Sequence, residues 1–194
     1  MRKAKAIMDN TELTPGTIWI TGLCASGKTT LGQSLVDNLI AIDIRNVEFL
    51  DGEALRQRLD RVYGYTTEER NAVLMNTIRI ARDYNHEGKV VIVATISHKK
   101  RIRELARQEI GHFMEVYLDC PVEVCAQRDY KGHYKKAYAN EYENFVGVTE
   151  PYELSDNPEL VLDTANKTVE ECSQLLLERV KSFLNSQIKQ EDEG

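Results

Sequence analysis

The sequence predicts an α/β fold of three layers, in which a parallel five-stranded sheet carries helices on both faces. Two observations lead to this prediction. Strand-like and helix-like segments alternate along most of the 194 residues, which is typical of a parallel sheet covered on both faces. In addition, Lys89–Ile96 (KVVIVATI) is a continuous apolar run, as expected for a strand that is buried on both of its faces.

Five short segments have the composition of strands. They are Thr17–Thr21, Val47–Leu50, Lys89–Ile96, Phe113–Leu118 and Leu160–Asp163. The segments between them have apolar residues at helical spacing. These predicted helices are Lys28–Leu39, Thr67–Glu87, Lys99–Ile110 and a last helix that runs to about Phe183. Thr-x-x-Glu capping pairs, which begin at Thr66 and Thr168, mark two of the helix starts.

The alternating pattern covers residues 15–186, and we predict one domain there. Residues 1–14 are expected to form a flexible leader, and residues 187–194 a flexible acidic tail. The stretch 129–158 breaks the pattern, because it is rich in Tyr, Lys, Gly and Asn and has no clean period. A loop of this length in a compact domain is usually functional, so we interpret it as a lid.

Composition and charge narrow the class of protein. Hydrophobic residues make up 42% of the chain and charged residues 29%, which is ordinary for a globular protein. The net charge of -6 disfavours a general nucleic-acid binder. The four cysteines form no CxxC pair and have no ligand spacing to the histidines, which favours reduced thiols over a zinc site. Without an apolar signal region or a membrane-length apolar stretch, the protein is expected to be cytoplasmic and free of membrane contacts.

Residues 22–29 (GLCASGKT) match the phosphate-binding pattern G-x-x-x-x-G-K-[ST] in full. The match lies between a predicted strand and a predicted helix, a context that a chance glycine turn would rarely have. We therefore predict a P-loop NTPase fold that binds ATP, with Mg²⁺ on the hydroxyl of Thr29. The predicted ATP contacts from this loop are Gly22, Ala25, Ser26, Gly27, Lys28, Thr29 and Thr30. No N-K-x-D string of a GTPase is present, and the length suits a small kinase.

Further short motifs follow the P-loop along the chain. They are residues 49–53 (FLDGE), 96–97 (IS), 125–132 (CAQRDYKG), 134–137 (YKKA), 145–148 (FVGV), 150–153 (EPYE), 158–160 (PEL) and 163–164 (DT). With the P-loop, this series resembles the adenylyl-sulfate kinase family in order and spacing from about residue 15 to 185. The resemblance implies a kinase that uses MgATP to phosphorylate the 3′-hydroxyl of adenylyl sulfate.

The resemblance assigns catalytic roles to Lys28 and Asp51. Lys28 would contact the β- and γ-phosphates. Asp51 ends a predicted strand, where a carboxylate faces the crevice that binds ligands in such sheets. It would accept the hydroxyl proton or hold Mg²⁺, directly or through a water molecule. A helix N-cap is the alternative role for Asp51, and the two roles are compatible.

The resemblance also implies contacts to the acceptor. Arg56 and Arg70 would hold its anionic group, because a guanidinium binds oxyanions in a bidentate way; surface charge is the alternative for both. Tyr65 and Phe145 match two aromatic residues that enclose the acceptor base, although aromatic pairs often belong to a core. Ser97 would lie near the acceptor.

Three further positions match nucleotide and phosphate contacts of the family. Arg128 would stack on the adenine of ATP, and Thr164 would line the same base. Lys131 lies in the predicted lid and would come close to phosphate on the acceptor side.

The chain departs from the family pattern on the acceptor side. Val73 stands where the family has an acceptor-contacting asparagine, two arginines that follow in the family are missing, and Tyr65 replaces a typical phenylalanine. Residues 96–100 are ISHKK where the family tends to have I-S-P-Y-R. Because the donor side is intact, we expect retained phosphoryl transfer with a changed acceptor.

These departures favour a non-standard nucleotide acceptor such as cytidine diphosphoramidate, which related kinases phosphorylate in capsule biosynthesis. A genuine adenylyl-sulfate kinase of sulfate assimilation remains the alternative. A third possibility is a regulatory module that binds nucleotide without kinase activity. The expected partner is a small-molecule nucleotide, with neither nucleic acid nor membrane involved, and a homodimer is left open.

Overall fold

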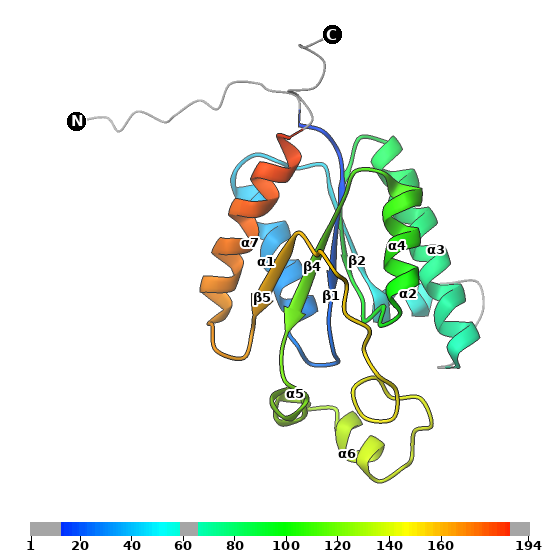
Figure 1. The fold of residues 1–194 in the computed structure, drawn as a ribbon. Coiled ribbons are helices and arrows are strands. Elements are labelled where there is room, and N and C mark those ends of the chain that lie inside the picture. The colour runs from blue at the N-terminus through cyan, green and yellow to red at the C-terminus, as the bar shows by residue number, and fades with distance from the viewer. Residues whose placement is uncertain (1–12, 59–65, 187–194) are drawn as a thin grey trace.

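A computed structural model describes residues 13–58 and 66–186 of the chain (Figure 1). Its centre is a five-stranded sheet of order β2-β3-β1-β4-β5, in which every neighbouring pair is parallel. The strands are β1 (Thr17–Thr21), β2 (Val47–Asp51), β3 (Val90–Ala94), β4 (Phe113–Asp119) and β5 (Leu160–Asp163). The predicted parallel α/β fold is confirmed.

Four long helices cover the two faces of the sheet (Figure 1). Helices α1 (Lys28–Ala41) and α7 (Val169–Leu184) pack together on one face. Helices α3 (Thr67–His86) and α4 (Lys100–Ile110) pack together on the other. None of the described helices is both long enough and apolar enough to cross a lipid bilayer.

Both predicted helix starts are confirmed as capping boxes. The side chain of Thr66 accepts a hydrogen bond from the backbone N–H of Glu69, whose carboxylate accepts one from the N–H of Thr66. Thr168 and Glu171 form the same reciprocal pair at the start of α7. Each pair satisfies two N–H groups that the first helical turn would otherwise leave without partners.

Three short helices were not predicted from the sequence: α2 (Gly52–Arg58), α5 (Val122–Arg128) and α6 (His133–Tyr138). Each has two turns or fewer, which is too short for a 3.6-residue period to become visible. The strand expected at residues 89–96 is shorter than its apolar run, because the chain leaves the sheet after Ala94. All three helices lie at or beyond the carboxyl ends of the strands, as Figure 1 shows.

The hydrophobic core has two halves, one on each face of the sheet. Ile18 and Ile20 of β1 belong to the half under α1 and α7, whereas Trp19 belongs to the half under α3 and α4. Successive side chains of a strand point to opposite faces, so one strand contributes to both halves. All three side chains are fully buried, and each such burial contributes about 1.5–3 kcal/mol to stability.

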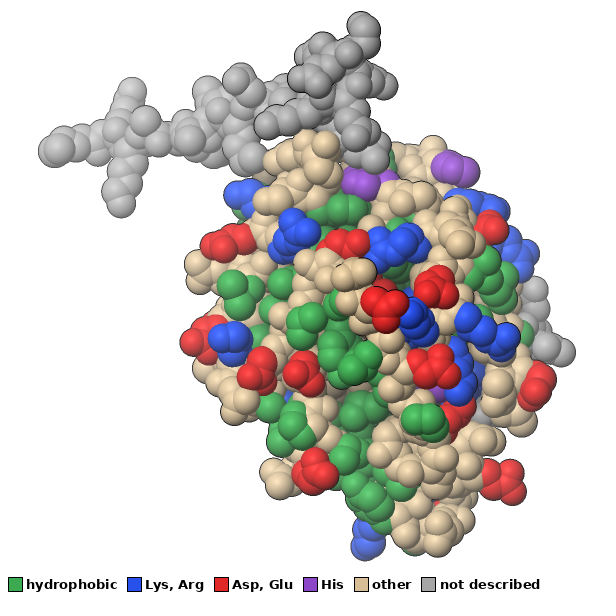
Figure 2. Space-filling model, viewed as in Figure 1, with side chains coloured by type: hydrophobic (Ala, Val, Ile, Leu, Met, Phe, Trp, Pro, Cys, Tyr) green, Lys and Arg blue, Asp and Glu red, His purple; other side chains and the backbone are tan. Residues whose placement is uncertain are grey.

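Strand β1 is the point where the order of connections reverses, because β3 lies on one side of it and β4 on the other. Ligands of open α/β sheets bind beyond the carboxyl ends of the strands at such a point. Each strand is followed there by a segment that contains predicted site residues. On the face that Figure 2 shows, acidic and basic side chains are interspersed.

Most residues of the predicted leader and all of the predicted tail (1–12 and 187–194) lie outside the described residues. Two leader residues are described, and both contact the domain. The backbone N–H of Thr14 donates to the carbonyl of Leu184 over 3.1 Å, and Leu13 packs against the core. Leu13 and Thr14 therefore pack with the described domain.

Candidate active site

The loop between β1 and α1 has the backbone of a phosphate cradle. Gly22 has a φ of 150°, and a Cβ there would lie 2.9 Å from the carbonyl oxygen of Leu118 on β4. Gly27 has a φ of 101°, and a Cβ there would meet no atom within 4 Å. The first glycine thus allows the loop to pack against the sheet. The second leaves open space beside the helix start, where a ligand can approach the backbone.

Polar groups at the start of α1 are available to an anion. Gly27 is the N-cap of α1 and offers no side-chain cap, and the first turn contains no acidic residue. The hydroxyl of Ser26 is buried and has no hydrogen-bond partner among the described residues. An unsatisfied buried polar group costs about 1–3 kcal/mol, which a phosphate oxygen would offset. These features fit the polyphosphate chain of ATP.

The ammonium group of Lys28 lies inside the cradle and donates to the carbonyl oxygen of Leu23. Burial lowers the pKa of Lys28, and the nearby Cys24 thiol and Asp51 carboxylate partly oppose this effect. A desolvated cation of this kind interacts strongly with an anionic ligand. The position agrees with the phosphate contact predicted for this lysine.

Asp51 has the N-cap role that the sequence left open, while its catalytic role stays a prediction. One carboxylate oxygen accepts hydrogen bonds from the backbone N–H groups of Glu53 (3.0 Å) and Ala54 (3.1 Å), which caps α2. The other oxygen accepts a hydrogen bond from the hydroxyl of Thr29 over 2.7 Å. The carboxylate at the end of β2 is therefore fixed directly beside the P-loop.

Thr29 and Asp51 form a donor set that suits Mg²⁺. No cluster of three or more His, Cys, Asp or Glu side chains that could hold a metal is found among the described residues. Mg²⁺ in phosphate sites needs no such cluster, because it keeps several water molecules and takes one or two protein oxygens together with phosphate oxygens. The threonine hydroxyl and the carboxylate would supply these protein oxygens.

A cavity of about 1260 Å³ opens above the P-loop. Ligand pockets usually measure about 300–1,000 Å³, so this cavity has room for two ligands of nucleotide size. Its walls contain nearly all the described residues that the sequence assigned to the site. These are Ala25, Ser26, Gly27, Lys28, Thr29, Thr30, Asp51, Arg56, Arg70, Ser97, Arg128, Lys131, Phe145 and Thr164. Gly22 lies at the base of the loop, and Tyr65 lies outside the described residues.

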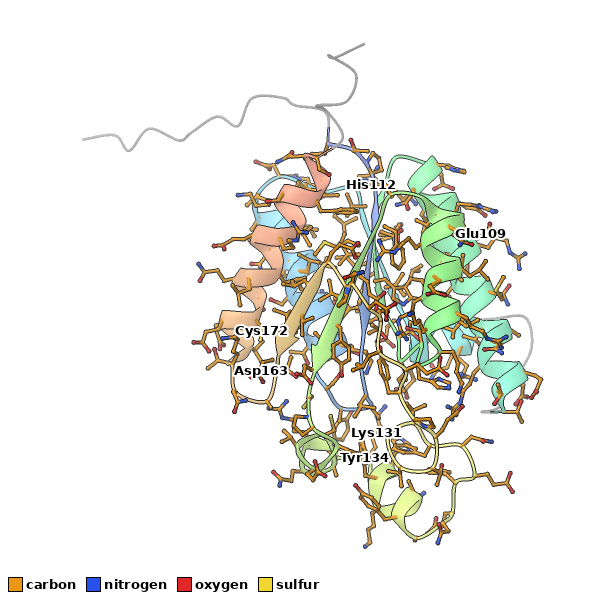
Figure 3. All side chains as sticks on the ribbon, in the orientation of Figure 1. Glu109, His112, Lys131, Tyr134, Asp163 and Cys172 are labelled. Atoms are coloured by element: carbon orange, nitrogen blue, oxygen red, sulfur yellow. The ribbon has the colours of Figure 1, made fainter. Side chains whose placement is uncertain are left out.

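Arg128 and Thr164 meet at the end of the cavity near β5 and α7. The guanidinium of Arg128 donates to the carbonyl oxygen of Thr164 over 2.9 Å and contacts the sulfur of Cys120 over 3.6 Å. Asp163 precedes this contact at the carboxyl end of β5, where Figure 3 labels it. A planar cation held beside a strand end is suited to stack on a nucleotide base.

The opposite wall, which we call the acceptor wall, contains Arg70, Ser97 and Phe145. The side chain of Arg70 is 15% exposed, donates to the carbonyl oxygen of Asn144 and pairs with Glu150 over 3.4 Å. Its surroundings are therefore unlike those of an ordinary surface charge. Arg56 of α2 also lines the cavity and is partly buried.

Ser97 is buried, and its hydroxyl already has two partners. It accepts a hydrogen bond from the indole N–H of Trp19 over 3.0 Å and lies 2.9 Å from the hydroxyl of Thr21. Its φ of 36° is unusual for a residue with a side chain, so the loop after β3 has a defined shape. Ser97 thus contributes to the acceptor wall from a fixed position.

The lid forms its own small cluster of aromatic rings. Phe145 stacks on Tyr142 with ring centres 5.8 Å apart and meets Tyr134 edge-on at 4.9 Å. It also lines the cavity, so it has the core role that the sequence left open, while its contact with the acceptor base stays a prediction. Figure 3 shows Tyr134 and Lys131 in the lid, beyond the carboxyl ends of the strands.

Lys131 lies in the predicted lid and contacts α2. Its ammonium group pairs with both carboxylate oxygens of Glu53, at 2.8 and 2.7 Å, and so joins the lid to α2. Glu53 follows Asp51 by two residues, so the pair spans the region between the lid and the carboxylate beside the P-loop. The phosphate contact expected for Lys131 remains a prediction.

The sequence indicates no role for Glu150 and His98, although both lie in short segments that follow the P-loop, residues 150–153 and 96–100. His98 lines the cavity, and Glu150 lies directly behind it, with its carboxylate 2.8 Å from the ring nitrogen Nε2. The two residues are separated by 52 positions, and neither follows a periodic pattern. One feature of the sequence could have indicated this contact: His98 stands where the family tends to have a proline.

Comparisons with known proteins agree with this geometry. A family model described as "Adenylylsulphate kinase" matches residues 14–163. An adenylyl-sulfate kinase of Synechococcus sp. (strain JA-3-3Ab) is 39% identical over 166 residues, which cover 86% of this chain and 94% of the relative. A probable adenylyl-sulfate kinase of Pseudomonas aeruginosa is 38% identical over 162 residues, which cover 84% of this chain and 75% of that protein.

Solved structures give the same result. The structure of the Mycobacterium tuberculosis APS kinase in complex with AMPPNP and APS superposes with a TM-score of 0.81 and 32% sequence identity. The match covers 88% of this chain and 99% of that one. A gluconokinase from Sinorhizobium meliloti matches with a TM-score of 0.63 at 18% identity, which indicates a shared fold alone.

Proposed function

Because this chain belongs to the adenylylsulphate kinase family, we propose that it transfers the γ-phosphoryl group of ATP to the 3′-hydroxyl of adenylyl sulfate. At the coarser level, it is an ATP-dependent kinase of the P-loop class that works with Mg²⁺. The observation that supports transfer to a hydroxyl is the contact of Asp51 with Thr29 over 2.7 Å, which holds a carboxylate beside the phosphate cradle in the cavity that Arg70 also lines. The choice of adenylyl sulfate is supported by the names of the relatives.

The proposed transfer follows from this arrangement. The amides at the start of α1 and the Lys28 ammonium hold the β- and γ-phosphates of ATP. Thr29 and Asp51 would hold Mg²⁺, which would neutralise phosphate charge when bound. The acceptor enters from the side of Arg56 and Arg70, whose guanidinium groups suit a phosphate–sulfate anion.

Asp51 accepts the proton of the 3′-hydroxyl as the new O–P bond forms and the bond from the γ-phosphorus to ADP breaks. In the proposed mechanism, the lid, which the ion pair of Lys131 with Glu53 joins to α2, excludes water from the cavity. This exclusion matters, because water competes with the hydroxyl as phosphoryl acceptor.

The acceptor expected from the sequence, cytidine diphosphoramidate, is less well supported than adenylyl sulfate. Two relatives that cover 86% and 87% of the chain bear the name adenylyl-sulfate kinase. One observation still favours a test of both: Val73 is buried and lines the cavity, so this part of the acceptor wall offers no amide to a base. A hydrogen-bonding site without its amide discriminates less between bases.

The experiment is an ADP-release assay with adenylyl sulfate, cytidine diphosphoramidate and simple nucleosides, each at several concentrations with MgATP. We expect the highest kcat/KM with adenylyl sulfate and a product phosphorylated at the 3′-position. A higher kcat/KM with cytidine diphosphoramidate would overturn the proposed acceptor while leaving the kinase class intact. ATP binding without turnover of any acceptor would favour a regulatory module instead.

A further inference from the structure

Glu150 lies where three cationic or titratable side chains meet behind the acceptor wall. Its carboxylate is 2.8 Å from Nε2 of His98, 3.4 Å from the Lys99 ammonium and 3.4 Å from the Arg70 guanidinium. The side chains of Glu150, Arg70 and His98 are 13%, 15% and 5% exposed. In such a buried place, charge-assisted hydrogen bonds are stronger than on the surface, and they define the positions of both partners.

The ionisation states of this cluster follow from its contacts. Burial would raise the pKa of Glu150, but the hydrogen bonds from His98 and Lys99 outweigh it and hold the pKa of this carboxyl below its usual value. Burial lowers the pKa of His98, which the bond to Glu150 offsets only in part. His98 is therefore mainly neutral at pH 7 and donates its Nε2–H to the carboxylate, because an ionised carboxylate can only accept.

The main chain of Glu150 also holds the loop that carries Phe145. The N–H of Glu150 donates to the carbonyl oxygen of Phe145 over 3.1 Å, and the carbonyl oxygen of Glu150 accepts from the N–H of Gly147 over 2.7 Å. Three residues later, the N–H of Glu153 donates to the carbonyl oxygen of His98 over 2.9 Å. One residue thus connects α3, the loop after β3 and the lid segment that faces the cavity.

We propose that Glu150 is a positioning residue for acceptor binding, which holds Arg70, His98 and the Phe145 loop in the geometry that the acceptor requires. The inference rests on the proposed function, since it assumes that an anionic nucleotide contacts Arg70 on the acceptor wall. Without the carboxylate, Arg70 would lose one of its partners and His98 would lose the acceptor of its Nε2–H. Both side chains would then adopt several orientations, and acceptor binding would weaken while ATP binding stays unchanged.

The first test compares Glu150→Gln with a matched control, Glu153→Gln, in the intact chain. Glu153 belongs to the same segment and also pairs with Lys99, over 3.3 Å, but it contacts neither Arg70 nor the side chain of His98. We expect Glu150→Gln to raise KM for adenylyl sulfate about tenfold or more, the loss typical of one charge-assisted hydrogen bond. KM for ATP should stay within about twofold in both variants. A folded Glu150→Gln protein with unchanged KM for adenylyl sulfate would overturn the inference, as would equal increases of both KM values.

Two further variants distinguish a positioning role of Glu150 from a general loss of structure. Glu150→Asp keeps the charge and should restore at least part of the acceptor affinity, which also covers the case that Glu150→Gln does not fold. His98→Ala combined with Glu150→Gln should raise KM by less than the product of the single effects, because Glu150 acts partly through His98. A positioning role would be contradicted if the two substitutions raised KM independently and Glu150→Asp restored no acceptor affinity.

Hydrogen exchange separates failure of this inference from failure of the proposed function. Amides of residues 144–150 should exchange faster in Glu150→Gln than in the wild type, and no such change should occur in Glu153→Gln. If the wild-type chain does not phosphorylate adenylyl sulfate, the proposed function is wrong, and the exchange result alone then decides whether Glu150 holds the Phe145 loop. Unchanged exchange at these amides in Glu150→Gln would overturn the inference, whichever acceptor the enzyme uses.

Discussion

The donor and acceptor sides of the cavity are built in different ways. The phosphate cradle of the donor side depends on one continuous segment, residues 22–30, whose backbone and Lys28 face the cavity. Only the base end of the donor side needs distant residues, Arg128 and Thr164. The acceptor side is assembled from α2, α3, the loop after β3 and the lid, which are connected by ion pairs and hydrogen bonds such as Arg70 with Glu150. Local geometry is thus sufficient for the phosphate cradle, whereas the acceptor side depends on long-range packing. Substitutions on the two sides should therefore have different consequences.

The largest expected effect comes from Lys28→Ala, which removes the cation of the cradle. We expect kcat to fall by about 10³-fold or more, because a group that stabilises developing charge in a dry site contributes that much. The melting temperature should stay close to that of the wild type, since removal of this desolvated charge offsets the loss of its hydrogen bond to Leu23. ADP release and a thermal melt measure the two quantities. Activity near the wild-type level would refute the P-loop assignment.

Asp51→Asn should give the next largest effect and separates the two roles of this residue. Asparagine is as good an N-cap as aspartate, so α2 and the melting temperature should be preserved. Proton acceptance would be lost, and kcat should fall about 10²–10⁴-fold. A parallel loss of stability and activity would show that capping is the dominant role. An unchanged kcat would exclude Asp51 as the proton acceptor.

Arg70→Ala should affect the acceptor side alone. We expect KM for adenylyl sulfate to rise about tenfold or more, as for other bidentate arginine contacts, with KM for ATP almost unchanged. Arg79→Ala is the matched control, because Arg79 lies on the same helix, is exposed and does not line the cavity. If both variants raise KM for adenylyl sulfate equally, the increase comes from the changed net charge. The assignment of Arg70 to the acceptor site would then be wrong.

The smallest expected effect is on stability as a function of pH. Because the pKa of His98 is lowered by folding, the unfolded chain binds more protons between that lowered pKa and the ordinary value near 6.5. The free energy of unfolding should therefore fall as pH decreases through this window. Denaturant titrations at pH 7.5 and 5.5 measure this free energy. In His98→Asn, its decrease between the two pH values should be smaller than in the wild type. An identical pH dependence in that variant would show that other groups are responsible.

Some parts of this molecule follow from local sequence alone. The P-loop pattern, the two capping boxes and the buried strands were all predicted, because each depends on residues within a few positions of one another. The residue assignments on the acceptor side depended instead on resemblance to a family. The short helix α2 and the ion pair of Lys131 with Glu53 had no visible signal in the sequence.

What the sequence determined by itself is the donor half of the chemistry: a phosphate cradle between a buried strand and a helix. The tertiary structure alone decided how the acceptor wall is held together. Arg70 and Glu150 are 80 positions apart, and His98 and Glu150 are 52 apart. No periodicity or short motif connects residues at such separations, since only the packing of the sheet, α3 and the lid brings their charges into one buried cluster.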